Sequence, residues 1–273
     1  MKKIILTIML LGAFLYGSSQ DLKSKSGFAV LPEAGDWSIG FDALPVINYF
    51  GNVFHSPSGS MGAYSPAGYP MTIVGKWVKD DGMAWRGKLR IGFGSNSQDS
   101  IFNDPHSTAN PPATYTNSYK NGHTNITLGF GMQKYMGAGR VQGYYGAEAW
   151  FGMASTSTTN TLGTTADSLT VAGPFVTSSS SGTTIMFGVR GFVGVEFFFA
   201  PKMSIGAEYG WGLGLSSTGS GSVTYEQWDF INHNLRTTTA KTGGSSAFGI
   251  DVDNGGNAVN WMGNGSINLS FYF

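Results

Sequence analysis

The sequence predicts an all-β protein: a transmembrane, antiparallel, up-and-down β-barrel of eight strands, with short periplasmic turns and long extracellular loops. Three observations lead to this fold class. Short segments alternate apolar with polar side chains, as strands with one apolar face do. Charged residues are only 12%, whereas aromatic residues reach 14% and glycines number 41. Beyond the N-terminus, no stretch approaches the roughly 20 apolar residues of a transmembrane helix.

The last eight residues give the clearest strand pattern. Ile267, Leu269, Phe271 and Phe273 share one parity, and the residues between them, Ser266 to Tyr272, carry polar atoms. A bare apolar strand edge invites aggregation in a soluble protein, whereas in a closed barrel the apolar face meets lipid and the strand pairs with the first one.

Seven further strands precede it, and each is predicted from the same alternation. Their ranges are 36–43, 71–78, 85–93, 125–133, 142–153, 185–199 and 204–215. In chain order, their apolar faces are marked by Trp37 and Phe41, Ile73 and Trp77, Leu89 and Phe93, Leu128 and Phe130, Tyr145 and Phe151, Val195 and Phe197, and Tyr209 and Trp211.

The connections between these strands alternate in length. Short ones fall at 79–83, 136–140 and 200–203, and long ones at 50–70, 94–123, 154–183 and 216–262. This alternation is typical of bacterial outer-membrane barrels and places both ends of the barrel on the periplasmic side. The long connections are rich in Ser, Thr, Gly and Asn, so we expect solvated, mobile loops. The last one could hold another hairpin, at 222–230 and 247–252, which makes ten strands the alternative.

Charged residues recur on the inward parity of the strands. They are close to balanced in sign: Asp42, Lys76, Arg86, Lys88, Arg90, Glu148, Arg190, Glu196 and Glu208. The interior of an eight-stranded barrel is just wide enough to be filled by side chains, and a charge buried there needs a partner. We therefore expect a network of ion pairs that fills the lumen. A proton relay, an ion path or a catalytic pair is the alternative interpretation.

The N-terminus reads as an export signal. Lys2 and Lys3 precede an apolar run from Ile4 to Tyr16, and the small residues after it predict cleavage near Ser19. The chain is thus divided into a signal peptide (1–19), a periplasmic segment (20–34) and an outer-membrane barrel (35–273). There are 0 cysteines, which excludes disulfides, thiolate metal sites and a lipid-modified cysteine.

No catalytic, cofactor or metal site is predicted. The four histidines, His55, His106, His123 and His233, fall in the loops or at a loop's end without metal-ligand spacing, so we expect separate solvated side chains. The segment 251–257 resembles a calcium loop but has Gly255 and Met262 where ligands are needed, so a polar turn is expected. A net charge of +0 without a basic run gives no support to nucleic-acid binding.

Several segments together resemble the small outer-membrane β-barrel proteins of Bacteroidota, in the wider OmpA/OmpX-type eight-stranded group. They are GDWSIGFD (35–42), PVINY (45–49), GVEFFFAPK (194–202), IGAEY (205–209) and the last strand that ends in Phe. The resemblance implies residence in the outer membrane, contact with its lipid and lipopolysaccharide, and insertion by the barrel-assembly machinery. It implies that Leu269, Phe271 and Phe273 form the C-terminal assembly signal.

The expected function follows from these predictions. We expect a non-enzymatic integral outer-membrane barrel with a filled lumen, in a structural role or contacting an outer-membrane complex or surface ligand through its long loops. A narrow channel or porin-like transporter is the first alternative. An enzyme at the barrel rim is the second, with His123 beside Ser118 or Thr124 as its nearest pairing in sequence.

Overall fold

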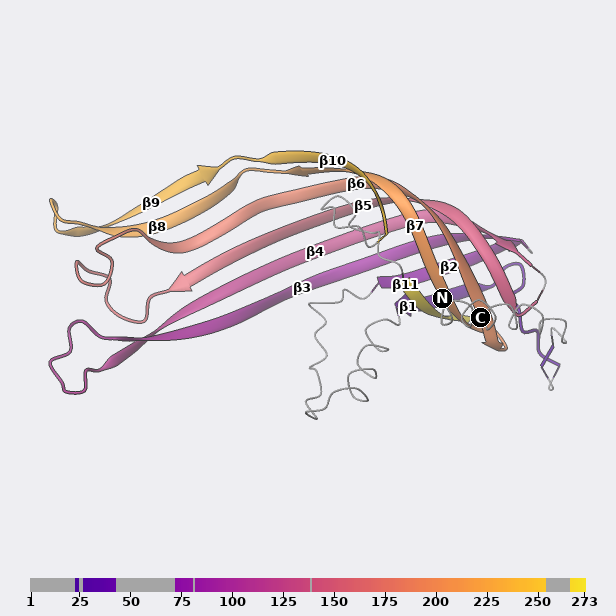
Figure 1. The fold of residues 1–273 in the computed structure, drawn as a ribbon, viewed down its shortest axis with the longest axis horizontal. Coiled ribbons are helices and arrows are strands. Elements are labelled where there is room, and N and C mark those ends of the chain that lie inside the picture. The colour runs from indigo at the N-terminus through magenta and orange to yellow at the C-terminus, as the bar shows by residue number, and fades with distance from the viewer. Residues whose placement is uncertain (1–22, 25–26, 43–71, 81, 138, 254–265) are drawn as a thin grey trace, which may run out of the picture.

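The computed structural model describes residues 23–24, 27–42, 72–80, 82–137, 139–253 and 266–273. In this part of the chain all regular structure is β-strand, arranged as one antiparallel sheet (Figure 1). The strands are β1 (Trp37–Asp42), β2 (Thr72–Asp80), β3 (Met83–Asn103), β4 (Thr114–Met136), β5 (Val141–Thr161), β6 (Phe175–Ala200), β7 (Met203–Thr218), β8 (Gly221–Asp229), β9 (Asn234–Thr242), β10 (Ser245–Val252) and β11 (Ser266–Tyr272). The described residues include no helix of the length and apolarity needed to cross a membrane.

Eight of these strands form a closed ring. Neighbouring strands pair from β1 to β7 in chain order, β7 also pairs with β11, and β11 pairs with β1. These are the eight strands expected from the alternating pattern. The short connections are confirmed as well, at Asp80 to Met83, Met136 to Val141 and Ala200 to Met203. We call the end of the ring that carries these three connections the turn end; β1 begins and β11 ends there.

The ring turns its polar side chains inward and its apolar ones outward. Trp37, Trp77 and Trp85 lie in one register row across β1, β2 and β3 and face outward. One residue further along, Lys76 pairs in register with Arg86, and both are buried. Because side chains alternate along a strand, each strand sends every second residue into the ring.

Beyond the ring the sheet continues as an open extension, which the sequence patterns did not predict. Within the described residues, β2 is paired with β3 as far as Thr72 and Arg90, whereas β3 and β4 remain paired to Asn103 and Thr114. β5 and β6 likewise reach Thr161 and Phe175. We call residues 94–103, 114–123, 154–161 and 175–184, together with β8 and β9, the sheet extension; Figure 1 shows it running away from the ring.

The expectation of long solvated loops at 94–123 and 154–183 is therefore wrong. Only 104–113 and 162–174 connect strands there. The segments are polar on both faces, so they lack the apolar alternation that marks a half-buried strand. Cross-strand hydrogen bonding still satisfies their backbone groups, and Thr is favoured in strands.

The region 216–262 was also expected to be one loop, with a hairpin as the alternative. Both proposed pieces are strands, β8 and β10, but they do not pair with each other and do not widen the ring. β8 pairs with β6 and with β9, a strand that the sequence patterns missed. β10 and β11 follow one another along the same edge of β7, at Val252 opposite Trp211 and at Ser266 opposite Glu208. The expected loop at 50–70 lies outside the described residues.

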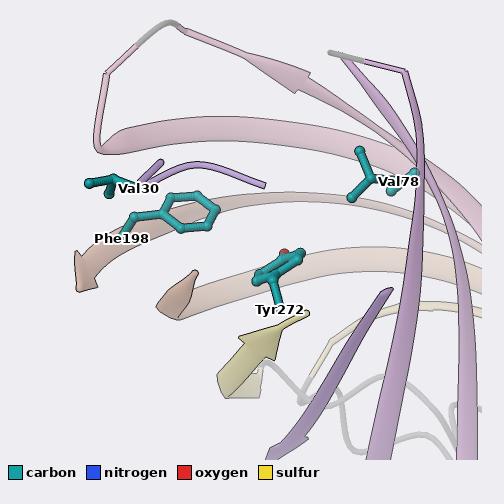
Figure 2. Packing of buried hydrophobic residues seen from close by; sticks show 5 residues of the cluster. Val30, Val78, Phe198 and Tyr272 are labelled. Atoms are coloured by element: carbon teal, nitrogen blue, oxygen red, sulfur yellow. The ribbon is translucent and has the colours of Figure 1, made fainter. Parts of the chain in front are cut away.

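The N-terminal segment packs against the turn end of the ring. Val30 is fully buried in a cluster with Val78, Ala84, Phe198 and Tyr272, all of which point inward (Figure 2). The amide of Lys202 donates to the Val30 carbonyl (3.0 Å), and that of Gly35 donates to the Val78 carbonyl (2.8 Å). We call residues 27–36 the stopper segment, because its Val30 side chain packs into the turn end of the ring.

Candidate functional site: an ion network inside the ring

Glu196 anchors the half of the network nearest the turn end. Its two carboxylate oxygens accept hydrogen bonds from Lys76 Nζ, at 2.9 and 3.0 Å. The hydroxyls of Tyr272 (2.8 Å), Tyr135 (3.2 Å) and Ser204 also donate to it. Glu196 and Ser204 have exposures of 1% and 0%. A buried carboxylate is stable when donors fill its oxygens, and here five donor contacts do so.

Glu148 and Glu208 share three cations in the other half of the network. Arg86 Nη1 lies 2.7 Å from Glu208, and Lys88 Nζ lies 3.0 Å from Glu148 and 3.1 Å from Glu208. Arg190 Nη1 reaches both carboxylates, at 3.0 and 2.8 Å. Arg86 Nε lies 3.4 Å from Glu148 Oε2, an ion pair without hydrogen-bond geometry. Each carboxylate therefore bridges several cations across the ring.

Asp253 completes this half, and the sequence patterns missed it. Its carboxylate accepts from Arg190 Nε (2.9 Å), from Arg190 Nη2 and from the Gly210 amide (2.7 Å). A side chain at Gly210 would overlap the Gly191 carbonyl and crowd the Arg190 guanidinium. The glycine therefore makes room for the pair. The segment 251–257 was expected to be a polar turn, because Gly255 and Met262 stand where calcium ligands are needed. Residues 254–257 lie outside the described part, and Asp253 is fully buried because the chain returns along β7.

Aromatic rings lie beside the cations of the network. Phe192 lies beside two guanidiniums, with ring centroid distances of 4.1 Å to Arg86 and 5.5 Å to Arg190. Lys76 Nζ lies 5.7 Å from the Tyr144 ring and 5.6 Å from the Tyr272 ring. Cations near aromatic faces gain favourable electrostatic energy in a desolvated site. The rings thus occupy space beside the ion pairs and stabilise the cations.

Seven of the nine predicted lumen residues come together in this network. They are Lys76, Arg86, Lys88, Glu148, Arg190, Glu196 and Glu208. Arg90 lies further along β3, toward the extension, and is half-buried. Asp42 belongs to β1, but its side chain is outside the described part. With Asp253 included, four cations face four carboxylates, so the network is neutral as a whole.

Gln133 is the main polar residue of the interior that the network leaves without a partner. It is fully buried, and neither its Oε1 nor its Nε2 makes a hydrogen bond within the described structure. The buried hydroxyl of Ser38 likewise makes no hydrogen bond within the described structure. Buried polar atoms of this kind are commonly satisfied by an internal water molecule. In the sequence, Gln133 could be recognised because it alternates with the apolar residues of β4 and so faces inward. Its register partner is Ala84.

Among the described residues, His106, His123 and His233 do not form a shared site, but His106 contacts two carboxylates. His106 Nδ1 lies 3.0 Å from Asp104, and its Nε2 contacts Asp167, which belongs to the connection between β5 and β6. His106 is thus paired with two carboxylates and not with another histidine. His123 and Gly94 are register partners, and the His123 ring fills the space over Gly94. His233 has a positive φ in the turn between β8 and β9, and His55 lies outside the described residues.

The rim pairing considered for catalysis does not occur. His123 lies on the opposite face of β4 from Ser118 and Thr124, because the parities differ. The Ser118 hydroxyl is 3.1 Å from that of Ser97 instead. Among the described residues, no cluster of His, Asp and Glu has the composition to hold a metal ion.

Leu269, Phe271 and Phe273, expected as an assembly signal, lie at the end of the chain on the outer face. Leu269 and Phe271 alternate with buried Asn268, Ser270 and Tyr272. Phe273 is 69% exposed, and its backbone exchanges hydrogen bonds with Trp37 (2.9 and 3.0 Å). The last residue is thus tied to the first strand at the seam of the ring.

Comparison with known proteins adds no relative from which function could be transferred. No protein family matches the chain. No curated protein matches it in sequence.

Proposed function

We propose that the chain is an integral outer-membrane β-barrel with a closed interior, which carries the sheet extension on the outer side of the membrane. The observation that carries this proposal is the inverted distribution of polarity around the ring. Phe130, Val193 and Trp211 on the outer face are 63%, 62% and 59% exposed, whereas Arg86 and Glu196 inside are 2% and 1% exposed. Soluble proteins rarely bury a large network of charged side chains while exposing large apolar side chains over a wide surface. Lipid is the solvent that favours this arrangement.

The height of the apolar surface supports the same proposal. On β3 the outward apolar residues run from Trp85 to Phe93, and Ser95 and Ser97 follow. At about 3.4 Å per residue, and with a tilt of about 40°, this band is roughly 20 Å tall, close to the apolar belt of outer-membrane barrels. On β5 the outward residues change from apolar to polar between Met153 and Ser155. This is the register position next to that of the change on β3.

Aromatic residues mark the turn-end margin of this band. The Trp37 and Trp77 rings stack at 5.8 Å, and Trp85 stacks on Phe130 at 5.4 Å. Indole rings favour the level of the lipid headgroups, because they are amphipathic. The three tryptophans lie in one register row, so they mark a single level around this side of the ring.

The interior supports a structural or binding role over conduction. The network and the stopper segment fill the ring with paired charges, aromatic rings and an apolar plug. The part that is free to contact partners is the sheet extension. We assign Leu269, Phe271 and Phe273 the role of the signal that the barrel-assembly machinery binds, since their apolar side chains lie outward at the end of the strand that closes the ring.

Labelling in intact cells tests the membrane placement. The chain has no cysteine, so single replacements give clean labels. Ala109→Cys, at the tip between β3 and β4, is expected to react with a membrane-impermeant maleimide, and Asp80→Cys, at the turn end, is expected to react only after the cells are opened. Equal labelling of both positions in intact cells, or recovery of the protein in the soluble fraction, would contradict the proposal.

A further inference from the structure

The two faces of the sheet extension carry different chemistry. Asn96 and Asn121 are register partners, as are Gln98 and Tyr119, and Ser100 and Asn117. Tyr119 also pairs with Asn160 of β5. These residues continue the parity of Lys88 and Arg90, so they extend the inner face of the ring. We call this set the amide face: Asn96, Gln98, Asn117, Tyr119, Asn121 and Asn160.

The opposite face of the same strands has hydroxyls and charges instead. Ser97 pairs with Lys120, and Asp99 with Ser118. On this face the hydroxyls of Ser97 and Ser118 contact each other at 3.1 Å. Strand alternation therefore separates a neutral amide face from a charged hydroxyl face, which the mixed sequence of these segments conceals.

The amide face is open to a ligand. Asn96, Gln98 and Asn121 are exposed, and no hydrogen bond within the described structure engages their side chains. The Tyr119 ring is 44% exposed. Nearer the tip, Phe102 is 46% exposed and stacks on its register partner Tyr115 at 5.8 Å, on the same face. Tyr115 and Tyr119 are four residues apart on one strand, which separates their rings by about 13 Å along it.

These groups suit one class of partner. A side-chain amide both donates and accepts hydrogen bonds, so it can bind two neighbouring hydroxyls of a sugar. An exposed aromatic ring offers an apolar platform to the C–H face of a sugar ring, and it loses little entropy on binding. Between Gly92 and Phe102 on β3, and between Tyr115 and Asn125 on β4, this face carries no Asp, Glu, Lys or Arg, and its one histidine is His123. Such a face has no fixed charge with which to attract phosphate, sulfate or carboxylate groups.

We propose that the amide face binds a neutral polysaccharide chain. The sugar rings stack on Tyr119 and on the Phe102 and Tyr115 pair, and Asn96, Gln98 and Asn121 bind their hydroxyls. The placement of this face on the outer side of the membrane rests on the proposed function; the binding itself does not.

The test uses the full-length protein purified in mild detergent. Its binding is measured to immobilised neutral oligosaccharides and to carboxylated and sulfated ones. We expect binding to neutral members, weakened about tenfold by Tyr119→Ala, the loss of one aromatic contact. Asn121→Ala is expected to weaken it as well, and Tyr119→Phe to preserve most of it. Lys120→Ala and Ser118→Ala, on the other face of the same strand, are the matched controls and should bind as the wild type does.

Two outcomes would overturn the proposal. One is that no neutral oligosaccharide binds while circular dichroism shows an intact β-sheet. The other is preferential binding of anionic oligosaccharides that is lost in Lys120→Ala and kept in Tyr119→Ala. Because binding is read in detergent, failure here is distinguishable from failure of the membrane placement, which is read by labelling of intact cells.

Discussion

Buried carboxylates inside the ring depend on shared cations, so single residues there carry large energies. Glu208 contacts Arg86, Lys88 and Arg190 at 2.7, 3.1 and 2.8 Å. Removing one partner of a buried ion pair is more damaging than never having had the pair, because the remaining charges stay desolvated. Parity identified Glu208 from the sequence, but parity does not tell which cations it meets.

Glu208→Ala is therefore expected to lower the free energy of unfolding by about 3 kcal/mol. Val195→Leu is the matched control: Val195 faces outward on β6 and is 49% exposed, so its enlargement should cost little. Unfolding midpoints in detergent with urea give the comparison. Equal midpoints for the two variants would show that the interior charges do not stabilise the ring.

His106 gives a second prediction at this scale. Hydrogen bonds to Asp104 and then to Asp167 raise the pKa of His106 above 6.5. The Asp104 pKa is lowered, mainly by the His106 backbone amide, and that of Asp167 by the Leu169 amide first. The ion pairs of His106 with Asp104 and Asp167 join the β3–β4 and β5–β6 connections. They are thus present at pH values above the carboxylate pKa values and below that of His106. They are lost as the pH rises through the raised His106 pKa.

Asp167→Asn should lower the His106 pKa, measured by NMR titration of the imidazole, because it removes one anion. Asp229→Asn is the control, since Asp229 bonds Asn232 and Ile231 in another turn. An unchanged His106 titration in Asp167→Asn would mean that the two connections are not tied in solution.

Among the elements, the stopper segment is attached to the ring by one fully buried side chain, a few backbone hydrogen bonds and one ion pair. Val30 contacts the apolar cluster at the turn end, and Lys202 adds an ion pair to Asp36 (2.8 Å) and an amide hydrogen bond to the Val30 carbonyl. No strand pairing joins residues 27–36 to the ring as a further strand. The segment is therefore expected to detach before the ring unfolds.

Val30→Asp should detach the stopper segment, because an unpaired carboxylate would be buried beside Phe198 and Tyr272. We expect faster hydrogen exchange at the Lys202 amide, while the amides shared between β5 and β6 stay protected. Phe28→Ala removes a neighbouring side chain that is 68% exposed and should change neither. Unaltered protection of Lys202 in Val30→Asp would show that Val30 is not the anchor.

For the molecule as a whole, the proposed closed interior predicts little or no steady conductance in planar bilayers. Arg190 and Glu148 are register partners on β6 and β5, with Arg190 Nη1 3.0 Å from the carboxylate. The double variant Arg190→Ala with Glu148→Ala removes bulk from mid-ring without leaving net charge. We expect more frequent small openings from it. Large, stable conductance of the unmodified protein would instead support a transporter.

The apolar alternation was sufficient to predict the eight strands of the ring, its three short connections and the inward parity of its charges. It worked there because one face of each strand is apolar and the other is polar. The same rule failed in the sheet extension, where both faces are polar, and at β9. It also could not identify Asp253, which lies just past a strand end.

The sequence by itself therefore determined which side chains face inward and which outward, since parity is a local property of an extended backbone. Only the tertiary structure decided which partners meet. Register placed Arg190 beside Glu148, the return of the chain along β7 placed Asp253 on Arg190, and the closure of the ring brought Lys76 and Glu196 together across the interior. These contacts join residues far apart in the chain, so no local pattern could contain them.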